Sequence, residues 1–455
     1  MRHVCLTAVV SAALSIALSA QQWPQWRGPD GTGVVRDGRL PLRWSDSAGV
    51  AWRVKLAGAG VSTPVSAGEY VFVTSQIGTA ERRPGNHPSL VQGGDPAAAG
   101  ESNLTARTSN DQITFVVAAH QLTDGASAWQ YRLAAEGQMP GLHDKHNMAT
   151  PSPAADDEVV ITWFGTGQVV GLSTDGVELW SKHLGMEYGP FDIMWGHASS
   201  PVLHGDLVLL VCYHASQSYV LALDKRTGQV RWKQDRQPGL LSYSTPLVVE
   251  TPGGAELVIN ASDGLEAISI ADGSSRWRLR EDNRFPIPVA TVSDGTLYTT
   301  RGYRSGPYYA IRLGGRGDVT DTHVQWRVPT GAPYVSSLIH YDGLIYTSSE
   351  TGIVTCLDAR TGERVWQERA GGVFTASPIA GDGRIYLVSE AGETVVLRAG
   401  RTFEVLARNK LTAHLVASPI AAGGRIILRS DDELIAVGGR AEADSIEWSV
   451  FRLPR

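Results

Sequence analysis

The chain has 455 residues, of which 42% are hydrophobic and 19% charged, so it can bury a large core and whole-chain disorder is excluded. Gly accounts for 50 residues and Trp for 13, which indicates many tight turns and frequent use of the largest aromatic side chain. The 40 basic and 46 acidic residues give a net charge of −6. This balance argues against a general binder of nucleic acids.

The N-terminus has the pattern of a secretory signal peptide. Arg2 precedes an apolar run over residues 4–18, and small residues follow up to Ala20. The run is short for a bilayer span, and the next two residues are polar, so we expect residues 1–20 to be cleaved. Cys5 precedes the run and does not fit a lipoprotein cysteine. Because no later apolar run reaches the length of a membrane span, we expect an exported protein, periplasmic or secreted.

Two cysteines remain after residue 20. Cys212 and Cys356 lie in apolar, strand-like runs, and neither belongs to a CxxC or CxxCH pattern. Two cysteines cannot build a disulfide framework. We expect two free, buried thiols.

A repeated unit organises most of the chain. Its clearest copy runs over residues 331–366, and it contains an Asp-Gly turn at 342–343, a Leu-Asp pair at 357–358, and a closing Thr-Gly-Glu-Arg-Val-Trp at 361–366. Each copy reads as four short strands separated by turn residues. A period of 40–50 residues with this pattern is typical of a β-propeller blade.

Tryptophans close these units at regular spacings. A Gly lies four residues before five of them, which supplies the positive φ that a tight turn between the third and fourth strands requires. A Trp in the outer strand can pack against the neighbouring blade. The structural blade tryptophans are Trp52, Trp129, Trp180, Trp232, Trp277, Trp326 and Trp366, with Leu406 at the eighth position.

The number of inner-strand starts predicts eight blades. Six are Ser-Pro or Thr-Pro pairs, and two are variants; the starts are Thr63, Ser152, Ser200, Thr245, Ile287, Ser337, Ser377 and Ser418. The last unit has only three strands after it, whereas residues 50–54 have no strands of their own before them. We therefore expect the N-terminal strand to complete the last blade and close the ring. Seven blades is the alternative if one variant unit is misassigned.

The predicted fold is all-β, an eight-bladed β-propeller of four-stranded antiparallel blades over residues 42–438. An N-terminal extension covers residues 21–41. Residues 76–110 are polar and glycine-rich, which predicts a long loop inserted in blade 1, either a lid or a linker, with the linker favoured. Residues 439–455 form a C-terminal tail without an assigned position.

The opening motif over residues 23–33 (WPQWRGPDGTG), followed by these repeats, resembles secreted bacterial PQQ-binding-like β-propeller proteins. This repeat occurs in quinoprotein dehydrogenases and in the propeller lipoprotein of outer-membrane protein assembly. The resemblance implies the propeller fold, and it makes pyrroloquinoline quinone (PQQ) with calcium a candidate cofactor. The chain lacks the adjacent cysteines of quinoprotein alcohol dehydrogenases, an alignable calcium-ligand set and a CxxCH haem site. It also lacks the N-terminal lipoprotein cysteine of the assembly factor.

A ligand funnel is expected where the segments that lead into the inner strands converge on one face. Flat aromatic and guanidinium groups there would suit a planar anion, a sugar or a peptide. The candidate residues are His146, Asn147, Trp163, Trp195, His197, Tyr243, Arg301, Tyr303, Arg304, Tyr334, Phe374 and His414, with His143, His214 and Phe285 beside them. Packing between blades is the alternative interpretation of the aromatic residues.

Chemistry-bearing motifs are few. His143 and His146 have i, i+3 spacing, but Asp144 and Lys145 between them indicate a solvated loop rather than a metal site. Arg316-Gly317-Asp318 is interpreted as a turn. Carboxylates at Asp192, Glu350, Glu390 and Asp431 could approach the channel, and a pair of them would be needed for glycoside cleavage. No nucleophile elbow, phosphate loop or dinucleotide fingerprint is present in the sequence.

These observations predict an exported, non-catalytic binding or assembly scaffold that acts as a monomer. Its partner would be another protein or a small planar or sugar ligand, with no nucleic acid, and no cofactor or metal is assigned. The alternatives are a PQQ-dependent oxidoreductase and, third, a carbohydrate-active enzyme.

Overall fold

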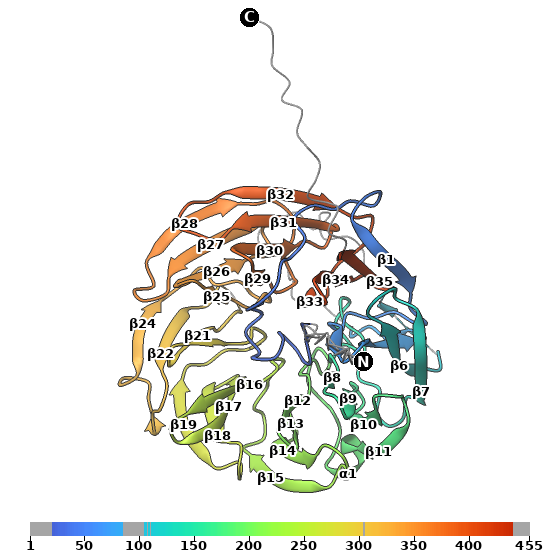
Figure 1. Ribbon diagram of the computed structural model, residues 1–455. Helices are drawn as coiled ribbons and strands as arrows, with labels where there is room; N and C mark the ends of the chain where they lie inside the picture. The colour runs from blue at the N-terminus through green and yellow to red at the C-terminus, as the bar shows by residue number, and fades with distance from the viewer. Residues whose placement is uncertain (1–20, 85–103, 107, 110, 304, 440–455) are drawn as a thin grey trace, which may run out of the picture.

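The computed structural model describes residues 21–84, 104–106, 108–109, 111–303 and 305–439. Eight sheets are arranged around a central axis as the blades of a propeller (Figure 1). Seven of them have four strands and one has a fifth. The prediction of an all-β, eight-bladed propeller is confirmed.

The first four blades follow in chain order. Blade 1 consists of β2 (Val65–Ala67), β3 (Tyr70–Ile77), β6 (Thr114–Gln121) and β7 (Ser127–Ala134). Blade 2 consists of β8 (Ala154–Ala155), β9 (Val159–Trp163), β10 (Gln168–Ser173) and β11 (Glu178–His183), followed by the short helix α1 (Leu184–Glu187). Blade 3 consists of β12 (Val202–His204), β13 (Leu207–Tyr213), β14 (Ser218–Asp224) and β15 (Val230–Arg236). Blade 4 consists of β16 (Leu247–Thr251), β17 (Gly254–Ala261), β18 (Gly264–Ser269) and β19 (Ser275–Arg280).

The other four blades complete the ring. Blade 5 consists of β20 (Thr291–Ser293), β21 (Thr296–Thr300), β22 (Tyr308–Arg312) and β24 (Val324–Val328). Blade 6 consists of β25 (Ile339–Tyr341), β26 (Leu344–Ser348), β27 (Ile353–Asp358) and β28 (Arg364–Arg369). Blade 7 consists of β29 (Ile379–Gly381), β30 (Arg384–Val388), β31 (Glu393–Arg398) and β32 (Val405–Lys410). Blade 8 consists of β33 (Ile420–Ala422), β34 (Arg425–Arg429), β35 (Glu433–Gly438) and β1 (Val50–Lys55).

The N-terminal strand closes the ring, as the sequence predicts. β1 pairs antiparallel with β35, and Trp52 lies opposite Ala436. One blade thus joins both ends of the propeller, and the edge of β35 is covered by β1. Figure 1 shows this blade with a blue outer strand beside red inner strands.

The closing tryptophans pack between blades against glycines. The indole Nε1 of Trp129 donates to the Thr174 carbonyl of blade 2 at 2.8 Å, and a Cβ on Gly176 would lie 2.6 Å from the Trp129 ring. Five glycines of this kind, each four residues before a Trp, have positive φ and accommodate the ring of the preceding blade: Gly125, Gly176, Gly228, Gly273 and Gly362. The repeated Gly therefore makes both the turn and the contact between blades.

Replacing Gly176 by Ala should lower the free energy of unfolding by about 2–4 kcal/mol, because strain at φ +84° adds to a clash with Trp129. Gly205 is the matched control, since its φ is +57° and a Cβ there meets nothing within 4 Å. Gly205→Ala should cost only about 1 kcal/mol. Urea unfolding of both variants measures the difference, and equal losses would contradict the role of the glycine as a seat for the Trp ring.

Trp277 departs from this pattern. Its indole donates to Glu256 in its own blade at 3.0 Å. Beside it, β23 (Gly317–Asp318), inserted between β22 and β24, pairs parallel with β19. The fifth strand is formed by Gly317 and Asp318 of the Arg-Gly-Asp tripeptide, in place of the predicted turn, and Arg316 before it pairs with Glu256. The fifth strand thus covers part of the outer edge of blade 4.

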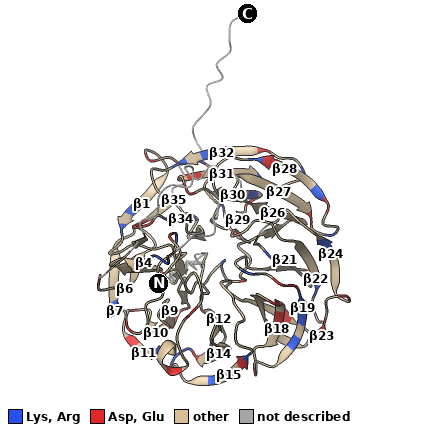
Figure 2. Ribbon diagram, turned by 180° about the vertical axis from the view of Figure 1, so that it is seen from behind, with Lys and Arg blue, Asp and Glu red and all other residues tan. Residues whose placement is uncertain are grey.

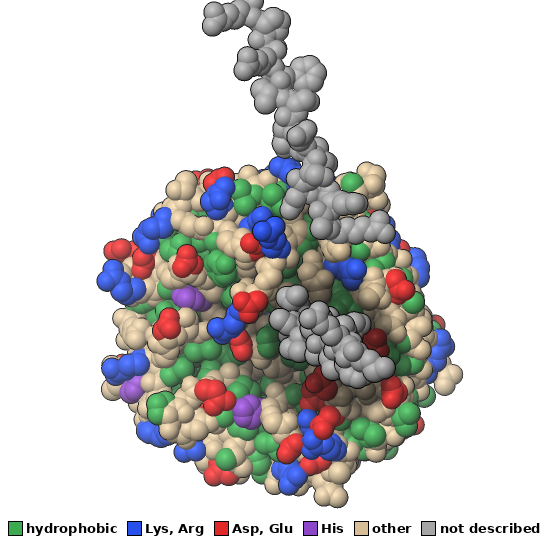
Figure 3. Space-filling view, viewed as in Figure 1, with side chains coloured by type: hydrophobic (Ala, Val, Ile, Leu, Met, Phe, Trp, Pro, Cys, Tyr) green, Lys and Arg blue, Asp and Glu red, His purple; other side chains and the backbone are tan. Residues whose placement is uncertain are grey.

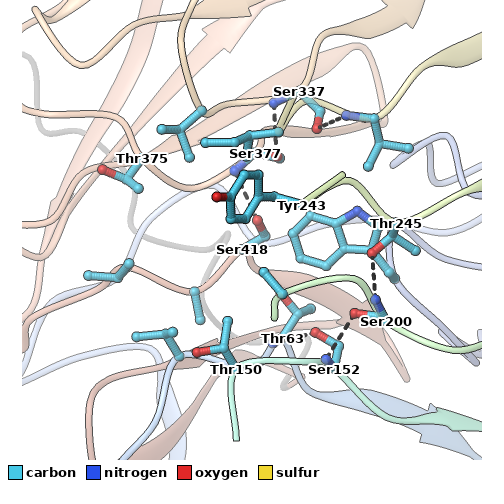
Figure 4. Close-up of a pocket in the computed structure, with 18 of the residues that line it drawn as sticks. Thr63, Thr150, Ser152, Ser200, Tyr243, Thr245, Ser337, Thr375, Ser377 and Ser418 are labelled. Carbon is cyan, nitrogen blue, oxygen red and sulfur yellow. Dashed lines mark hydrogen bonds between the residues drawn. The ribbon is translucent and has the colours of Figure 1, made fainter. Parts of the chain in front are cut away.

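A belt of hydroxyl groups joins the inner strands around the channel. At the start of an inner strand, the backbone N–H of one residue donates to the Ser or Thr hydroxyl of the corresponding residue in the next blade. These hydrogen bonds form two series, one from Thr63 to Thr245 and one from Val289 to Ser418 (Figure 4). The distances are 2.8–3.0 Å. The belt residue of blade 5 is Val289 rather than Ile287, which places the predicted start of that blade two residues too early. Val289 lacks a hydroxyl group, and this interrupts the belt after Thr245.

The N-terminal extension closes one end of the central channel. The backbone of Trp23 pairs with Ser66 of blade 1, and the Pro24 carbonyl accepts from Ala155 of blade 2 at 2.7 Å. Further along, Val35 donates to the Ala380 carbonyl of blade 7. Trp26 lines the channel cavity. The opening motif is therefore a structural plug, visible as the blue segment near the axis in Figure 1.

Arg27 fixes the plug. Its guanidinium donates to the carbonyls of Thr32, Leu338 and Pro378, and the residue is only 3% exposed. Burial lowers the pKa of Arg27 to about 9. A Cβ on Gly33 would lie 2.7 Å from this guanidinium. Arg27 and the glycines of the opening motif thus stabilise one compact turn at the plugged end of the channel.

Several predicted segments fall wholly or partly outside the described residues. These are the signal peptide 1–20, residues 85–103, 107 and 110 of the inserted loop, and residues 440–455 of the tail. The described parts of the loop include β4 (Ala80–Glu81) and β5 (Thr105–Ala106), which pair in parallel.

Charged residues lie mainly on the outer strands (Figure 2). Both signs are interspersed over the face shown in Figure 3, with no broad region of one sign. No helix among the described residues is long and apolar enough to cross a membrane.

Candidate functional site

Two adjoining cavities occupy the axis of the propeller. The channel cavity, of about 180 Å³, extends from Trp26 of the plug to Lys145 and Tyr243 and is lined largely by the hydroxyl belt and by Val and Ala side chains. The second cavity, of about 110 Å³, shares Lys145 and Tyr243 and adds Trp195 and other aromatic residues. The plug lies at the opposite end of the channel from this second cavity. Figure 4 shows the Tyr243 ring among the lining residues of the channel cavity, with its hydroxyl directed toward the side of Thr375.

The end of the channel at the second cavity, opposite the plug, is the mouth of the channel. Five aromatic side chains form an aromatic cup there. Four of them precede inner strands and one lies in the connection between β21 and β22; they are Trp195, Tyr243, Phe285, Tyr334 and, in that connection, Tyr303. Phe285 makes edge contacts with Trp195 at 6.5 Å, Tyr243 at 6.3 Å and Tyr303 at 4.8 Å between ring centroids. Trp195 and Tyr303 are half-buried, and the other three are buried. The structure thus brings four predicted funnel residues together with Phe285.

Trp163, His197 and His214 lie behind the cup, not in it. All three are 0% exposed, and His197 Nδ1 lies 3.2 Å from His214 Nε2. Burial lowers the pKa of His214 to about 4 and that of His197 well below its ordinary value. These predicted funnel residues belong to a closed cluster with Phe191, so they are unavailable to a ligand in the cup.

His146 joins this cluster to the cavity. It lines the second cavity, and burial lowers its pKa to about 3. Its Nε2 makes no hydrogen bond of regular geometry among the described residues, but the backbone of His197 and Gly196 approaches the ring. The described residues hold no group of three or more His, Cys, Asp or Glu side chains able to bind a metal ion.

A charged network forms the other side of the mouth. Lys145 Nζ lies 2.7 Å from Glu390 Oε2, and Glu390 is fully buried. Thr375 also donates to Glu390. His414 Nδ1 lies 3.1 Å from Asp431, and its other face points toward Glu390. Hydrogen bonds to both carboxylates raise the pKa of His414 to about 10, so the network holds His414 as a cation.

The expectation that Lys145 lies in a solvated loop is wrong. Its side chain is only 13% exposed, because it spans the channel mouth to reach Glu390 from blade 7. That contact joins residues 245 positions apart, and no local pattern could reveal it. Asp144 pairs with Arg82 and His143.

Glu350 is a buried carboxyl group next to the cup. Its oxygens accept from the backbone N–H groups of Val335 at 2.6 Å and Tyr334 at 3.4 Å. Burial raises the pKa of Glu350 to about 7. The side chain lines neither cavity, so it positions the Tyr334 segment instead of facing a ligand.

Arg301 is a brace between blades rather than a ligand contact. It is 2% exposed, and its guanidinium donates to Asn260 and to the carbonyls of Gly264, Ala261 and Glu281 of blade 4. Burial lowers its pKa to about 10. These N–H donors point away from the cup. The prediction that Arg301 contacts a ligand in the funnel is therefore corrected. Arg304 lies outside the described residues.

Two other predicted funnel residues have structural positions. Asn147 is 1% exposed; its amide donates to the Ala59 carbonyl and its oxygen accepts from Ala149. Phe374 is fully buried in the core between blades 6 and 7. Neither lines the channel cavity or the second cavity.

The sequence profile of the family described as "Outer membrane protein assembly factor BamB" matches the chain in overlapping segments, residues 27–218, 113–368, 265–400 and 350–451. Together these segments span almost the whole propeller and most of the plug. No curated protein matches the sequence.

Solved structures with the same fold include an assembly factor and two dehydrogenases. BamB from Moraxella catarrhalis is 16% identical, with a TM-score of 0.53 over 72% of this chain and 93% of that one. A europium-containing methanol dehydrogenase is 13% identical, with a TM-score of 0.60 over 90% and 89%. Quinohemoprotein alcohol dehydrogenase from Comamonas testosteroni is 13% identical, with a TM-score of 0.63 over 96% and 82%. At these identities the likeness concerns the fold alone.

Proposed function

Because the chain belongs to the family of the outer membrane protein assembly factor BamB, we propose that it is an exported, monomeric, non-catalytic scaffold that binds a protein partner at the aromatic cup. The exported location is supported by the N-terminal pattern of the sequence and by the family description, which names an outer membrane protein assembly factor. Half-buried Trp195 and Tyr303 carry the proposal. Trp and Tyr dominate the binding energy of protein interfaces because they bury large areas at low cost in conformational entropy.

The charged side of the mouth supports binding rather than catalysis. Lys145 and Glu390 form an ion pair, and Thr375 and His414 lie next to the same carboxylate. A nucleophile or general base must reach a substrate atom, whereas the Glu390 carboxylate is covered by its own partners. Glu350 is buried beneath backbone amides. This arrangement argues against the third candidate, a glycosidase with two facing carboxylates.

The residues present do not fit PQQ with calcium. A cavity of about 150 Å³ holds a single benzene ring, so cavities of about 110 and 180 Å³ are small for a fused three-ring quinone. Lys145, the one Lys or Arg that lines either cavity within the described residues, is already paired. Cys212 and Cys356 are separate, buried thiols. The dehydrogenase alternative therefore receives support from the fold but not from this site.

Calorimetric titration with PQQ plus CaCl₂ tests the proposal against this alternative. At a protein concentration of about 100 µM, where micromolar binding is readily detected, we expect no saturable heat and no dye reduction with alcohols or sugars. Saturable micromolar binding that is lost in a folded Tyr303→Ala variant would overturn the scaffold proposal.

A further inference from the structure

Two guanidinium groups lie over the rings of the aromatic cup. Arg83 Cζ is 5.9 Å from the centroid of Trp195, and Arg284 Cζ is 5.2 Å from that of Phe285. Burial raises the pKa of the Tyr243 hydroxyl well above its ordinary value, and both arginines oppose that rise. The positive charges therefore act on the interior of the cup.

Arg284 is the better placed of the two to meet a ligand. It is exposed and makes no ion pair among the described residues. It immediately precedes Phe285 in the connection between β19 and β20. Within the described part of the chain, no Asp or Glu lines the second cavity. The nearby carboxylates Asp144 and Glu350 are engaged by Arg82 and by backbone amides. The cup thus combines apolar walls with positive charge at its rim.

Two buried polar atoms in the cavity wall lack regular partners. Tyr243 Oη and His146 Nε2 make no hydrogen bond of normal geometry among the described residues, and both residues are 8% exposed and line the second cavity. The backbone approaches both side chains, with the N–H of Trp195 at Tyr243 and with His197 and Gly196 at His146, so the proton of the Tyr243 hydroxyl is the group left to donate. Buried polar groups are otherwise almost always hydrogen-bonded. An acceptor atom on a ligand would satisfy the Tyr243 hydroxyl.

We propose, building on the scaffold function above, that the cup binds an extended peptide segment that carries an aromatic side chain beside a carboxylate. A cavity of about 110 Å³ has room for most of one six-membered ring, since a cavity of about 150 Å³ holds a whole benzene ring. The ring packs against Trp195, Phe285 and Tyr334, and the carboxylate meets the Arg284 guanidinium in a charge-assisted hydrogen bond. The carboxylate comes either from a neighbouring Asp or Glu or from the C-terminus of the partner.

Fluorescence polarisation with labelled Gly-Ser decapeptides tests this assignment on the mature protein. One probe carries a central Asp-Phe-Asp and an amidated C-terminus, a second ends in Phe with a free carboxylate, and a third carries Ser-Phe-Ser. Lys-Phe-Lys and Asp-Ala-Asp probes complete the set. We expect the first or second probe to bind at least five-fold more tightly than the last three, and their order identifies the source of the carboxylate.

Variants separate the contribution of charge from folding. Arg284→Gln should weaken binding of the tighter of the first two probes (the carboxylate probe) about 5- to 10-fold. It should leave binding of the Ser-Phe-Ser probe unchanged. Tyr243→Phe should weaken the carboxylate probe as well, while Arg364→Gln, an exposed change on the distant strand β28, should change nothing.

Equal binding of Asp-Phe-Asp, Ser-Phe-Ser and Lys-Phe-Lys, all lost in Trp195→Ala, would overturn the carboxylate assignment and leave the scaffold function standing. Failure of every probe up to about 1 mM, the edge of measurable affinity, would overturn the peptide assignment. If PQQ bound in that case, the scaffold function would fall too.

Discussion

Glu390→Gln is expected to lower the free energy of unfolding by about 3–5 kcal/mol, because it removes the buried counter-charge of Lys145 and His414. Glu390 is 0% exposed and Lys145 only 13%, so water replaces the lost carboxylate only in part. Both cations would remain in a site that was built to neutralise them. Urea unfolding at neutral pH measures the loss.

Glu404→Gln is the matched control for this change. Glu404 forms an equally short ion pair with Arg398, but the two side chains are 49% and 60% exposed. The expected loss there is below about 1 kcal/mol. A second control, the double variant Lys145→Met with Glu390→Gln, should recover part of the stability, because the uncompensated ammonium group is gone. A loss at Glu390 no larger than that at Glu404 would contradict the description of this network.

The buried histidines should make the protein lose stability in acid. His146, His197 and His214 have pKa values lowered by burial, to about 3 and about 4 for the first and last. The unfolded chain therefore binds more protons below pH 6.5. Their contribution is complete above about pH 7 and is lost as pH falls from 6.5 toward the folded pKa values, by about 1.4 kcal/mol per histidine at pH 5.5 and about 4 kcal/mol for the three.

Two groups with raised pKa values act in the opposite direction. Glu350, at about 7, and His414, at about 10, gain protons in the folded state as pH falls. The test is therefore a difference between variants. Between pH 7.5 and 5.5 the wild type should lose about 3 kcal/mol more than His197→Gln with His214→Gln, which no longer has two of the three histidines. Identical pH profiles would contradict the neutral, buried state of these residues.

The sequence predicts the architecture well because each blade repeats the same local chemistry. The Asp-Gly pairs at 342–343 and 382–383 adopt positive φ at both residues in their turns, and the Gly before each closing Trp does so as well. Such constraints act within a few residues. Ring closure by residues 50–55 follows from counting strands. The shifted start of blade 5 shows the limit, since a Pro two residues early imitated the Ser-Pro signal there.

The site was less predictable because its contacts are non-local. The aromatic cup assembles from connections that all precede inner strands or link strands at one face, so their convergence could be expected. Whether a side chain points into the channel or behind it depends on packing between blades, which separates Trp195 from Trp163. The Arg301 brace and the Lys145–Glu390 pair arise from residues in different blades. Arg83 and Arg284 carried no motif at all.

Site-specific photocrosslinking from the cup tests the central claim most directly. A photoreactive phenylalanine analogue at position 303 samples the half-buried rim, and the same group at position 186 samples an exposed site on α1, where Met186 is 71% exposed. In living cells we expect one discrete crosslinked protein from position 303, lost in Trp195→Ala and displaced by the Asp-Phe-Asp peptide, and none from position 186. Crosslinking that is equal at both positions, or absent from position 303 in a protein that binds PQQ, would contradict a protein-binding cup.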